Sequence, residues 1–330
     1  MKCIKTAIVG CGARSEGHAQ AALKGSGLEV VFACDVQPAR AEEKARAWQA
    51  EPCTDYKQAF ADPTVEAVII VTNVETHVPI AREALAAGKH VIVEKPLGND
   101  LAAARELVAL GEENGLVAHM SYQVRFSKQR VRLKEAAARV DPVQIYSAHQ
   151  RGMMKPQFLN ATPFCGIMDV CAHDFDQILW IMDRPPVAVT ASLRRNTFTS
   201  DTDAADVLSA LIEFGDGRSA VVCSSIGAKE IGRRLDVIGA CGNISSNGGA
   251  RSKGVTFARY DSTGTKDTVD LSVAGEDALD SDLQKAFVAE IRGGQRSHAA
   301  RLEDGLNSLL VTLGCLKSAE EGRRVALAQF

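Results

Sequence analysis

The stretch TAIVGCGARS, residues 6–15, decides the fold of the first half of the chain. A short apolar strand runs into a turn with Gly10 and Gly12, and the helix-prone segment 14–24 follows directly. In such a strand–turn–helix, the first glycine permits the tight turn and the second lets the backbone approach a pyrophosphate at the helix N-terminus. The third glycine position of this fingerprint is Ser15, which loosens the match. The residues predicted to bind a dinucleotide through this turn are Gly10, Gly12, Ala13 and Arg14.

Short strand-like and helix-like runs alternate through residues 1–121. The strand candidates are 6–10, 28–34, 67–72, 90–94 and 116–121, and the helix candidates are 14–24, 38–50, 76–87 and 101–114. Alternation at this spacing is typical of βαβ units around a parallel sheet. The run AVIIV at 67–71 is apolar throughout, as expected of a strand covered on both faces. We therefore predict a doubly wound α/β Rossmann domain over residues 1–121.

The pattern changes in residues 122–330. Strand candidates dominate here, at 143–151, 187–194, 207–214, 219–226, 234–239 and 255–260. The helix candidates are 128–139, 167–182, 281–291 and 304–321. Asp216-Gly217 between two of the strand candidates is a strong hairpin signal. We predict a second domain of the α+β class over 122–330, with an antiparallel sheet and the substrate site.

A carboxylate ends the second strand candidate. Asp35 lies 23 residues after Gly12, where a carboxylate accepts hydrogen bonds from both hydroxyl groups of an adenosine ribose. Because it also repels a 2′-phosphate, we predict NAD as the cofactor and NADP as the less favoured one. Two alternatives are that Asp35 only caps the following helix, and that Arg40 accepts a 2′-phosphate.

Glu94-Lys95-Pro96 follows the apolar run 90–93. Ligands collect at the carboxyl ends of the strands in a doubly wound sheet, so Lys95 is placed where a nicotinamide would lie. Its long side chain would let the ammonium group reach a substrate hydroxyl. The alternative is that Lys95 is a solvated residue at the end of a strand.

A second group of polar residues lies in the helix candidate 167–182. At 100° per residue, Asp169, His173 and Asp176 fall within about 60° of one another. The roughly opposite, apolar face carries Cys171, Phe175, Ile178 and Met182. A carboxylate one turn from an imidazole orients it and stabilises its charged form, which gives histidine general-base character. A solvated polar face is the alternative, and no further cluster of residues completes a metal site.

Composition and charge exclude several classes of function. The net charge is −3 and the sequence pI is about 6.2, so no basic surplus indicates binding to nucleic acid or to anionic lipid. The apolar runs are far shorter than the roughly 20 residues of a membrane span. The nine cysteines are dispersed without a CxxC pair, which favours reduced thiols. We expect a cytoplasmic protein without a metal, a nucleic-acid partner or a membrane partner.

These motifs together make the chain resemble the Gfo/Idh/MocA family, named after glucose–fructose oxidoreductase, inositol dehydrogenase and rhizopine catabolism. The resemblance covers nearly the whole chain. It rests on GCG at 10–12 with Asp35, on GKHVIVEKP at 88–96, on the Asp169, His173 and Asp176 spacing, and on SAEEGRRV at 318–325. It implies a Rossmann domain followed by an open-faced antiparallel sheet that commonly makes homodimer or homotetramer contacts. It also implies NAD(P)-linked redox chemistry on sugars, cyclitols or related compounds.

The resemblance also implies roles for individual residues. By matching positions, Lys95 would polarise the reacting oxygen, His173 would be the acid/base, and Asp169 would hold the substrate and assist the pair. Further cofactor contacts are expected from Thr72, Asn73, His77, Glu94, Lys95 and Gln123. This chain departs from the family's Thr-Pro-Asn-x-x-His turn at two positions, where Asn73 replaces the proline and Val74 the asparagine.

The leading hypothesis is reversible hydride transfer between nicotinamide and a ring secondary alcohol of a sugar or cyclitol. A neutral ring is favoured because Asp169 and Asp176 would both face it. Arg125 and Arg151 are candidate substrate ligands, with an interdomain ion pair as the alternative for Arg125. The alternative functions are a ketoreductase acting on an oxo-sugar or sugar nucleotide, and a non-catalytic dinucleotide-binding sensor. A non-catalytic sensor would not require Lys95, Asp169 and His173 together, whereas a dehydrogenase would.

Overall fold

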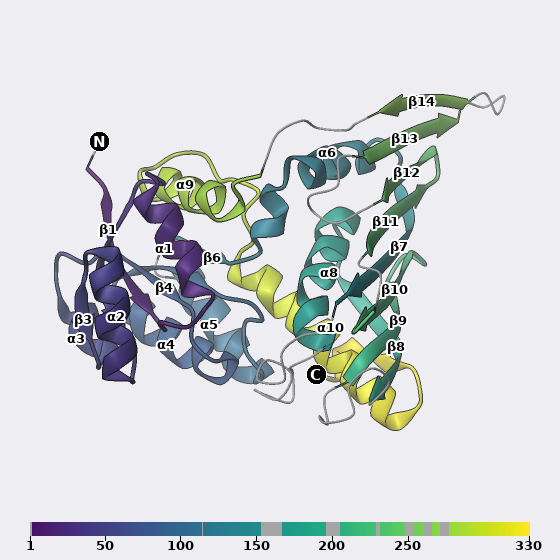
Figure 1. The fold of residues 1–330 in the computed structure, drawn as a ribbon. Helices are drawn as coiled ribbons and strands as arrows, with labels where there is room; N and C mark the ends of the chain where they lie inside the picture. The colour runs from purple at the N-terminus through teal and green to yellow at the C-terminus, as the bar shows by residue number, and fades with distance from the viewer. Residues whose placement is uncertain are drawn as a thin grey trace. The chain divides into compact units, whose positions relative to one another are not determined.

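The structure is a computed structural model, and the chain forms two compact units (Figure 1). It describes residues 2–113, 115–152, 167–195, 205–228, 232–247, 254–260, 266–270 and 277–330. The first unit comprises Met1–Phe126 and Ala278–Leu306, and the second comprises Ser127–Asp277 and Asn307–Phe330. The segment 278–306, which the sequence placed in the second domain, therefore has its contacts in the first unit. The division of the chain after residue 121 stays a prediction.

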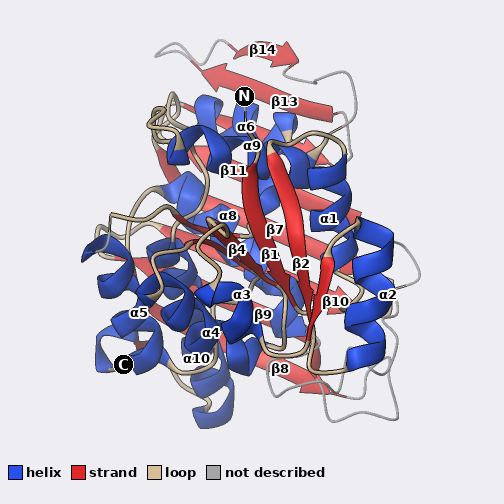
Figure 2. Cartoon of the chain, turned by 90° about the vertical axis from the view of Figure 1, so that its left-hand side faces the viewer, coloured by secondary structure: helices blue, strands red, loops and turns tan. Residues whose placement is uncertain are grey.

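The first unit is built on a six-stranded parallel sheet in the order β3-β2-β1-β4-β5-β6. Its strands are β1 (Ile4–Val9), β2 (Leu28–Cys34), β3 (Glu51–Cys53), β4 (Ala67–Ile70), β5 (His90–Val93) and β6 (Ala118–Met120). Its helices are α1 (Ser15–Leu23), α2 (Pro38–Trp48), α3 (Tyr56–Ala61), α4 (Val74–Ala86), α5 (Leu101–Glu113), η1 (Gln123–Phe126) and α9 (Leu279–Ile291). Figure 2 shows α1 and α2 on one side of β1 and β2, with α4 and α5 on the other side. The predicted doubly wound parallel sheet is confirmed.

The strand order reverses between β1 and β4, and this reversal positions the cofactor turn. The chain adds β2 and β3 on one side of β1, and β4, β5 and β6 on the other side. In doubly wound sheets, ligands bind at the carboxyl ends of the two strands where the order reverses, which are β1 and β4 here. All four residues of β4 are buried, as the apolar run predicted. The sequence missed β3 and α3, because β3 has only three residues, of which Glu51 and Pro52 are exposed.

Helix α9 joins the hydrophobic core of the first unit although it lies far away in the sequence. Leu283, Phe287 and Val288 pack in one cluster with residues of β1 and α1. Gln284 is buried too, and its amide donates to the carbonyl oxygen of His18 at 2.9 Å. Because the apolar side of α9 is covered by α1 and the sheet, the segment 278–306 stabilises the cofactor unit.

The second unit is a nine-stranded sheet in the order β14-β13-β12-β11-β7-β10-β9-β8-β15. Its strands are β7 (Pro142–Arg151), β8 (Pro186–Arg195), β9 (Ala205–Phe214), β10 (Ser219–Ile226), β11 (Gly232–Gly239), β12 (Gly242–Asn247), β13 (Gly254–Tyr260), β14 (Lys266–Asp270) and β15 (Val325–Ala326). Its helices are α6 (Lys128–Ala137), α8 (Ile167–Met182), η2 (Leu327–Gln329) and most of α10 (Leu302–Glu321). The sheet is mostly antiparallel, as predicted, but β7 and β10 pair in parallel.

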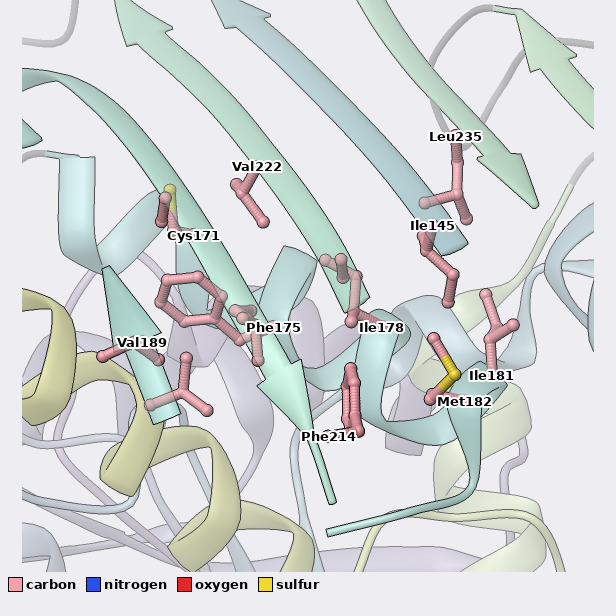
Figure 3. Packing of buried hydrophobic residues seen from close by; sticks show 14 of the residues in the cluster. Ile145, Cys171, Phe175, Ile178, Ile181, Met182, Val189, Phe214, Val222 and Leu235 are labelled. Carbon is pink, nitrogen blue, oxygen red and sulfur yellow. The ribbon is translucent and has the colours of Figure 1, made fainter. Parts of the chain in front are cut away.

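One face of this sheet is covered by α8 (Figure 3). The predicted apolar side of the helix is confirmed, since Cys171, Phe175 and Ile178 are all fully buried. They pack in one cluster with inward-facing residues of the strands, including Val189 and Val222. The alternating burial of β9 and β10 indicates that each strand sends every second side chain into this core. The packing fixes which side chains of α8 remain outside it.

We expect Phe287→Ala to lower the free energy of unfolding by about 3–5 kcal/mol, because it removes a fully buried aromatic ring from the core of the first unit. Urea denaturation measures this change. The matched control is Leu23→Ala on the exposed end of α1, where a change within about 0.5 kcal/mol is expected. Similar losses in both variants would contradict the packing of α9 in the core.

Candidate functional site

The turn after β1 has the shape that a bound pyrophosphate requires. Gly10 has a φ of +99°, and a Cβ at this position would lie 2.4 Å from the carbonyl oxygen of Val71. Only glycine fits there without strain. A Cβ on Gly12 would meet no atom within 4 Å, so the backbone at this position borders open space. The turn thus leaves room for an anion beside the N-terminus of α1.

Ser15 accounts for the departure from the usual glycine pattern. Its side chain is fully buried, and Oγ donates a hydrogen bond of 2.6 Å to the carbonyl oxygen of Gly12. The hydroxyl group therefore fixes the turn from inside, where a glycine would leave it less constrained. The fingerprint is met in geometry although the third residue differs.

Asp35 lies at the carboxyl end of β2 and holds the same turn. Its carboxylate accepts hydrogen bonds of 2.9 Å from the backbone N–H groups of Cys11 and Gln37. A carboxylate has about four acceptor positions, so two such bonds leave capacity for ribose hydroxyl groups. The next residue, Val36, is 83% exposed. Arg40 is exposed in the first turn of α2.

Glu94 is a buried acid at the end of β5 with three side-chain partners. It accepts hydrogen bonds from Arg14 Nε at 2.6 Å and Ser121 Oγ at 2.7 Å, and lies 3.0 Å from His18 Nε2. Burial alone would raise the pKa of this carboxyl, but the Arg14 guanidinium and His18 hold it well below its ordinary value. Glu94 is therefore ionised, and it fixes the chain directly before Lys95.

Arg14 connects Glu94 to α9. Its two terminal nitrogens donate to the carboxylate of Asp280, at 2.8 and 2.5 Å, while Nε is held by Glu94. A guanidinium paired on both sides in this way has its donors engaged within the protein. The sequence reading named Arg14 as a cofactor ligand without indicating either partner.

His77 connects the two loops that follow β4 and β5. Nδ1 lies 2.8 Å from the carbonyl oxygen of Pro96, and Nε2 lies 3.1 Å from that of Thr72. Burial lowers the pKa of His77, and a neutral imidazole has only one N–H to donate. The Thr72 hydroxyl accepts from Thr76 Oγ1 at 2.7 Å, and Asn73 is the exposed N-cap of α4. The loop around Lys95, which is half-buried, is thus tied to this turn.

Gln123 and Arg125 lie in the short helix η1. Arg125 is almost completely buried, and its Nη2 lies 3.0 Å from the carboxylate of Asp304. This ion pair of Arg125 joins two segments of the first unit, so it is not the interdomain pair given as the alternative. Gln123 is half-buried.

In the second unit, α8 holds the predicted acid/base residues. Asp169 and His173 are half-buried and one helical turn apart, outside the apolar core. Asp176, in contrast, is 1% exposed, so it does not extend their polar surface. Arg151 is exposed at the end of β7. Residues 153–166, which follow Arg151 closely in the sequence, lie outside the described residues.

Asp174, next to His173, is a buried acid that the sequence reading did not single out. Its carboxylate lies 3.0 Å from His149 Nδ1 and is paired with Arg233. Burial would raise the pKa of Asp174, but Arg233 and His149 lower it well below its ordinary value. In the register of the sheet, His149 on β7 faces Arg233 on β11. Asp174 can contact both residues because β7 and β11, which are far apart in the sequence, pair in the sheet.

Two features are absent from the described residues. These residues contain no group of three or more His, Cys, Asp or Glu side chains that could hold a metal ion. Among the same residues, no helix is both long and apolar enough to cross a membrane.

The fold and the turn define a dinucleotide-binding protein of the Rossmann class. Residues 4–122 match the family model described as "Oxidoreductase family, NAD-binding Rossmann fold" (GFO_IDH_MocA), and residues 139–245 match the Gfo/Idh/MocA C-terminal domain. The chain belongs to the Gfo/Idh/MocA family and is an NAD-binding oxidoreductase.

Two relatives with a stated activity cover 98% and 71% of the chain. An inositol 2-dehydrogenase of Rhizobium meliloti is 24% identical, with 98% of this chain and 99% of the relative covered. A UDP-N-acetylglucosamine 3-dehydrogenase of Acidithiobacillus ferrooxidans is 29% identical, over 71% of each chain. The crystal structure of GenD2 from gentamicin A biosynthesis in complex with NAD has a TM-score of 0.83 at 24% identity, with 99% of this chain and 97% of GenD2 covered. At this identity the structural likeness shows the fold.

We expect Asp35→Ser to lower kcat/KM for NAD by about 10–100-fold, because the ribose loses a charged hydrogen-bond acceptor. The wild type should use NAD better than NADP, and the variant should narrow this difference. Steady-state kinetics with both cofactors measure it, with Glu43→Ser on the exposed surface of α2 as the control. A wild type that uses NADP equally well would reject the role of Asp35 and indicate Arg40 instead.

Proposed function

We propose that the protein oxidises a ring secondary alcohol of a sugar or cyclitol with NAD, and reduces the ketone in the reverse direction. The observation that carries this proposal is the pair of half-buried residues Asp169 and His173, one turn apart on α8. Two relatives, named inositol 2-dehydrogenase and UDP-N-acetylglucosamine 3-dehydrogenase, support the substrate class. The ketoreductase alternative uses the same residues in reverse.

Each residue has one role in this reaction. Bound NAD would supply the acceptor for the hydride that leaves the carbinol carbon. His173 takes the hydroxyl proton, and Asp169 orients the imidazole and stabilises its charged form. Lys95 donates to the same oxygen and stabilises the negative charge that develops on it. No metal is needed for these steps.

The cofactor would be held mainly by the backbone of the first unit. Gly10, Gly12 and Ala13 offer the turn that fits a pyrophosphate, and Asp35 accepts from the ribose. Thr72 and Asn73 follow the carboxyl end of β4, and Gln123 begins η1 after β6. We assign these three residues contacts with the nicotinamide half. His77, Glu94 and Arg14 are paired within the protein, so we assign them the positioning of the loops.

We also propose that the protein is a cytoplasmic homo-oligomer. Among the described residues of the second unit, large apolar side chains are exposed on strands of its sheet at Val143, Val187, Leu211 and Ile238. Apolar residues at outward positions of several strands are typical of a sheet face that pairs with another subunit. Light scattering of the purified protein tests this assignment.

The first test is a substrate panel. Purified protein with NAD is offered cyclitols, aldohexoses, hexuronates, lactate and malate, and formation of NADH is followed by absorbance. Turnover of at least one ring compound is expected. Turnover of lactate or malate alone would reject the ring-alcohol proposal, and so would the absence of turnover with every compound and either cofactor.

The second test separates chemistry from cofactor binding. His173→Ala and Lys95→Ala should each lower kcat by about 10²–10⁴-fold, while His173→Ala keeps its affinity for NADH. If both residues act on one oxygen, the double variant should lose less than the product of the single losses. Fluorescence titration with NADH and kcat measurements provide the data, with Trp180→Phe on the same helix as the control. Retention of most activity in His173→Ala would assign the proton transfer elsewhere.

A further inference from the structure

The second unit contains a buried cation whose charge is not balanced by a direct partner. Arg130, on the first turn of α6, is 1% exposed. None of its three guanidinium nitrogens has a hydrogen-bond partner, and no described acid forms an ion pair with it. Burying a charged group without a partner costs several kcal/mol, so structures rarely contain one without a reason.

Arg130 is electrostatically coupled to the group around Asp174. Burial and the neighbouring Arg233 lower the pKa of Arg130 to about 9, while Asp174 opposes this shift. Asp174 is already shared between Arg233 and His149. Arg130 comes from α6, Arg233 from β11, His149 from β7 and Asp174 from α8, so four elements of the second unit meet here.

The charges of this group do not cancel. Arg130 and Arg233 carry two positive charges at neutral pH, and Asp174 supplies one negative charge. Ser224, directly opposite His149 on β10, adds a buried hydroxyl group without a charge. The group therefore has a surplus of at least one positive charge in a desolvated place, and one oxyanion would neutralise it while filling the guanidinium donors of Arg130.

We propose that Arg130 and Arg233 bind an oxyanion, a carboxylate or a phosphate, that the ring substrate carries. Asp174 and His173 are consecutive on α8 and point about 100° apart, so the oxyanion would bind beside the side of the helix that carries the acid/base residue. Substrates of the right class are hexuronates and sugar phosphates. This proposal rests on the proposed function, which leaves the substituents of the ring open.

The proposal revises the charge argument for a neutral ring. That argument placed Asp169 and Asp176 together at the ligand, but Asp176 is buried. Asp176 therefore does not contribute a negative charge to the substrate site, whereas Arg130 contributes a positive one. The side chains of α8 and its neighbours thus favour a substrate that carries an acid group.

The first experiment measures anion binding without any turnover. Thermal unfolding is followed in sodium phosphate and in sodium chloride of the same ionic strength, for the wild type, Arg130→Met and Arg132→Met. Arg132 lies on the same helix but is exposed, which makes it the matched control. Phosphate should raise Tm by about 2–4 °C in the wild type and the control, and by less than 1 °C in Arg130→Met. Equal phosphate effects in all three proteins would overturn the oxyanion site.

The second experiment identifies the source of the anion. With a hexuronate as substrate, Arg130→Met should lower kcat/KM by about 10–100-fold, whereas with the corresponding neutral hexose it should change kcat/KM by less than threefold. Equal effects on both substrates would overturn the assignment to the substrate. Phosphate could raise Tm through Arg130 while the enzyme shows no preference for the hexuronate over the neutral hexose. That result would also overturn the assignment to the substrate, and it would indicate a site for a free anion.

The two proposals fail in different ways. If no ring alcohol is oxidised, the proposed function fails while the thermal experiment still decides whether Arg130 binds an oxyanion. If neutral rings are oxidised and Arg130→Met behaves like Arg132→Met in both experiments, only the oxyanion site fails.

Discussion

The arrangement of the first unit around Lys95 depends on the pairing of the buried, ionised carboxylate of Glu94. It is buried where β5 ends, and its partners come from the start of α1 and from the residue after β6. A buried carboxylate must be paired to remain charged, and the loss of one partner would leave it uncompensated. Through Arg14 the same network reaches Asp280, so the segment 278–306 is fastened to the carboxyl edge of the sheet. The loop that presents Lys95 begins at this carboxylate.

The second unit also contains a buried, paired carboxylate, that of Asp174, at the edge of its hydrophobic core. Phe175 and Ile178 on α8 are covered by the sheet, and Asp174 on the same helix turns toward Arg233 and His149. The polar pairs fix the rotation of α8 about its axis, because a rotated helix would expose Phe175 and separate a buried acid from its cations. This rotation leaves Asp169 and His173 accessible. Their orientation is therefore a consequence of packing on the opposite side of the helix.

The sequence predicted the parts of the fold that depend on local patterns. β2, α8 and β10 have the predicted bounds, because each combines a clear periodicity with residues that end the element. It missed β12 and β14, short strands that are defined by their neighbours in the sheet. In the candidate site, Asp35, Asp169 and His173 were recognised from spacing. Glu94 was named only as a member of a motif, since its partners are 27 to 80 residues away.

The same limit explains why the sequence indicated the reaction class better than the substrate. The turn with Gly10 and Gly12 is a local feature, and it recognises the phosphates of a cofactor through backbone groups. The substrate is instead recognised by side chains from elements that only the tertiary fold brings together. In the sequence, Arg130 is one of several basic residues in a polar helix. In the folded protein it is a buried charge near Arg233 without a hydrogen-bond partner. Because such a charge is costly unless an anion meets it, the folded chain indicates the chemistry of a ligand that no single segment specifies.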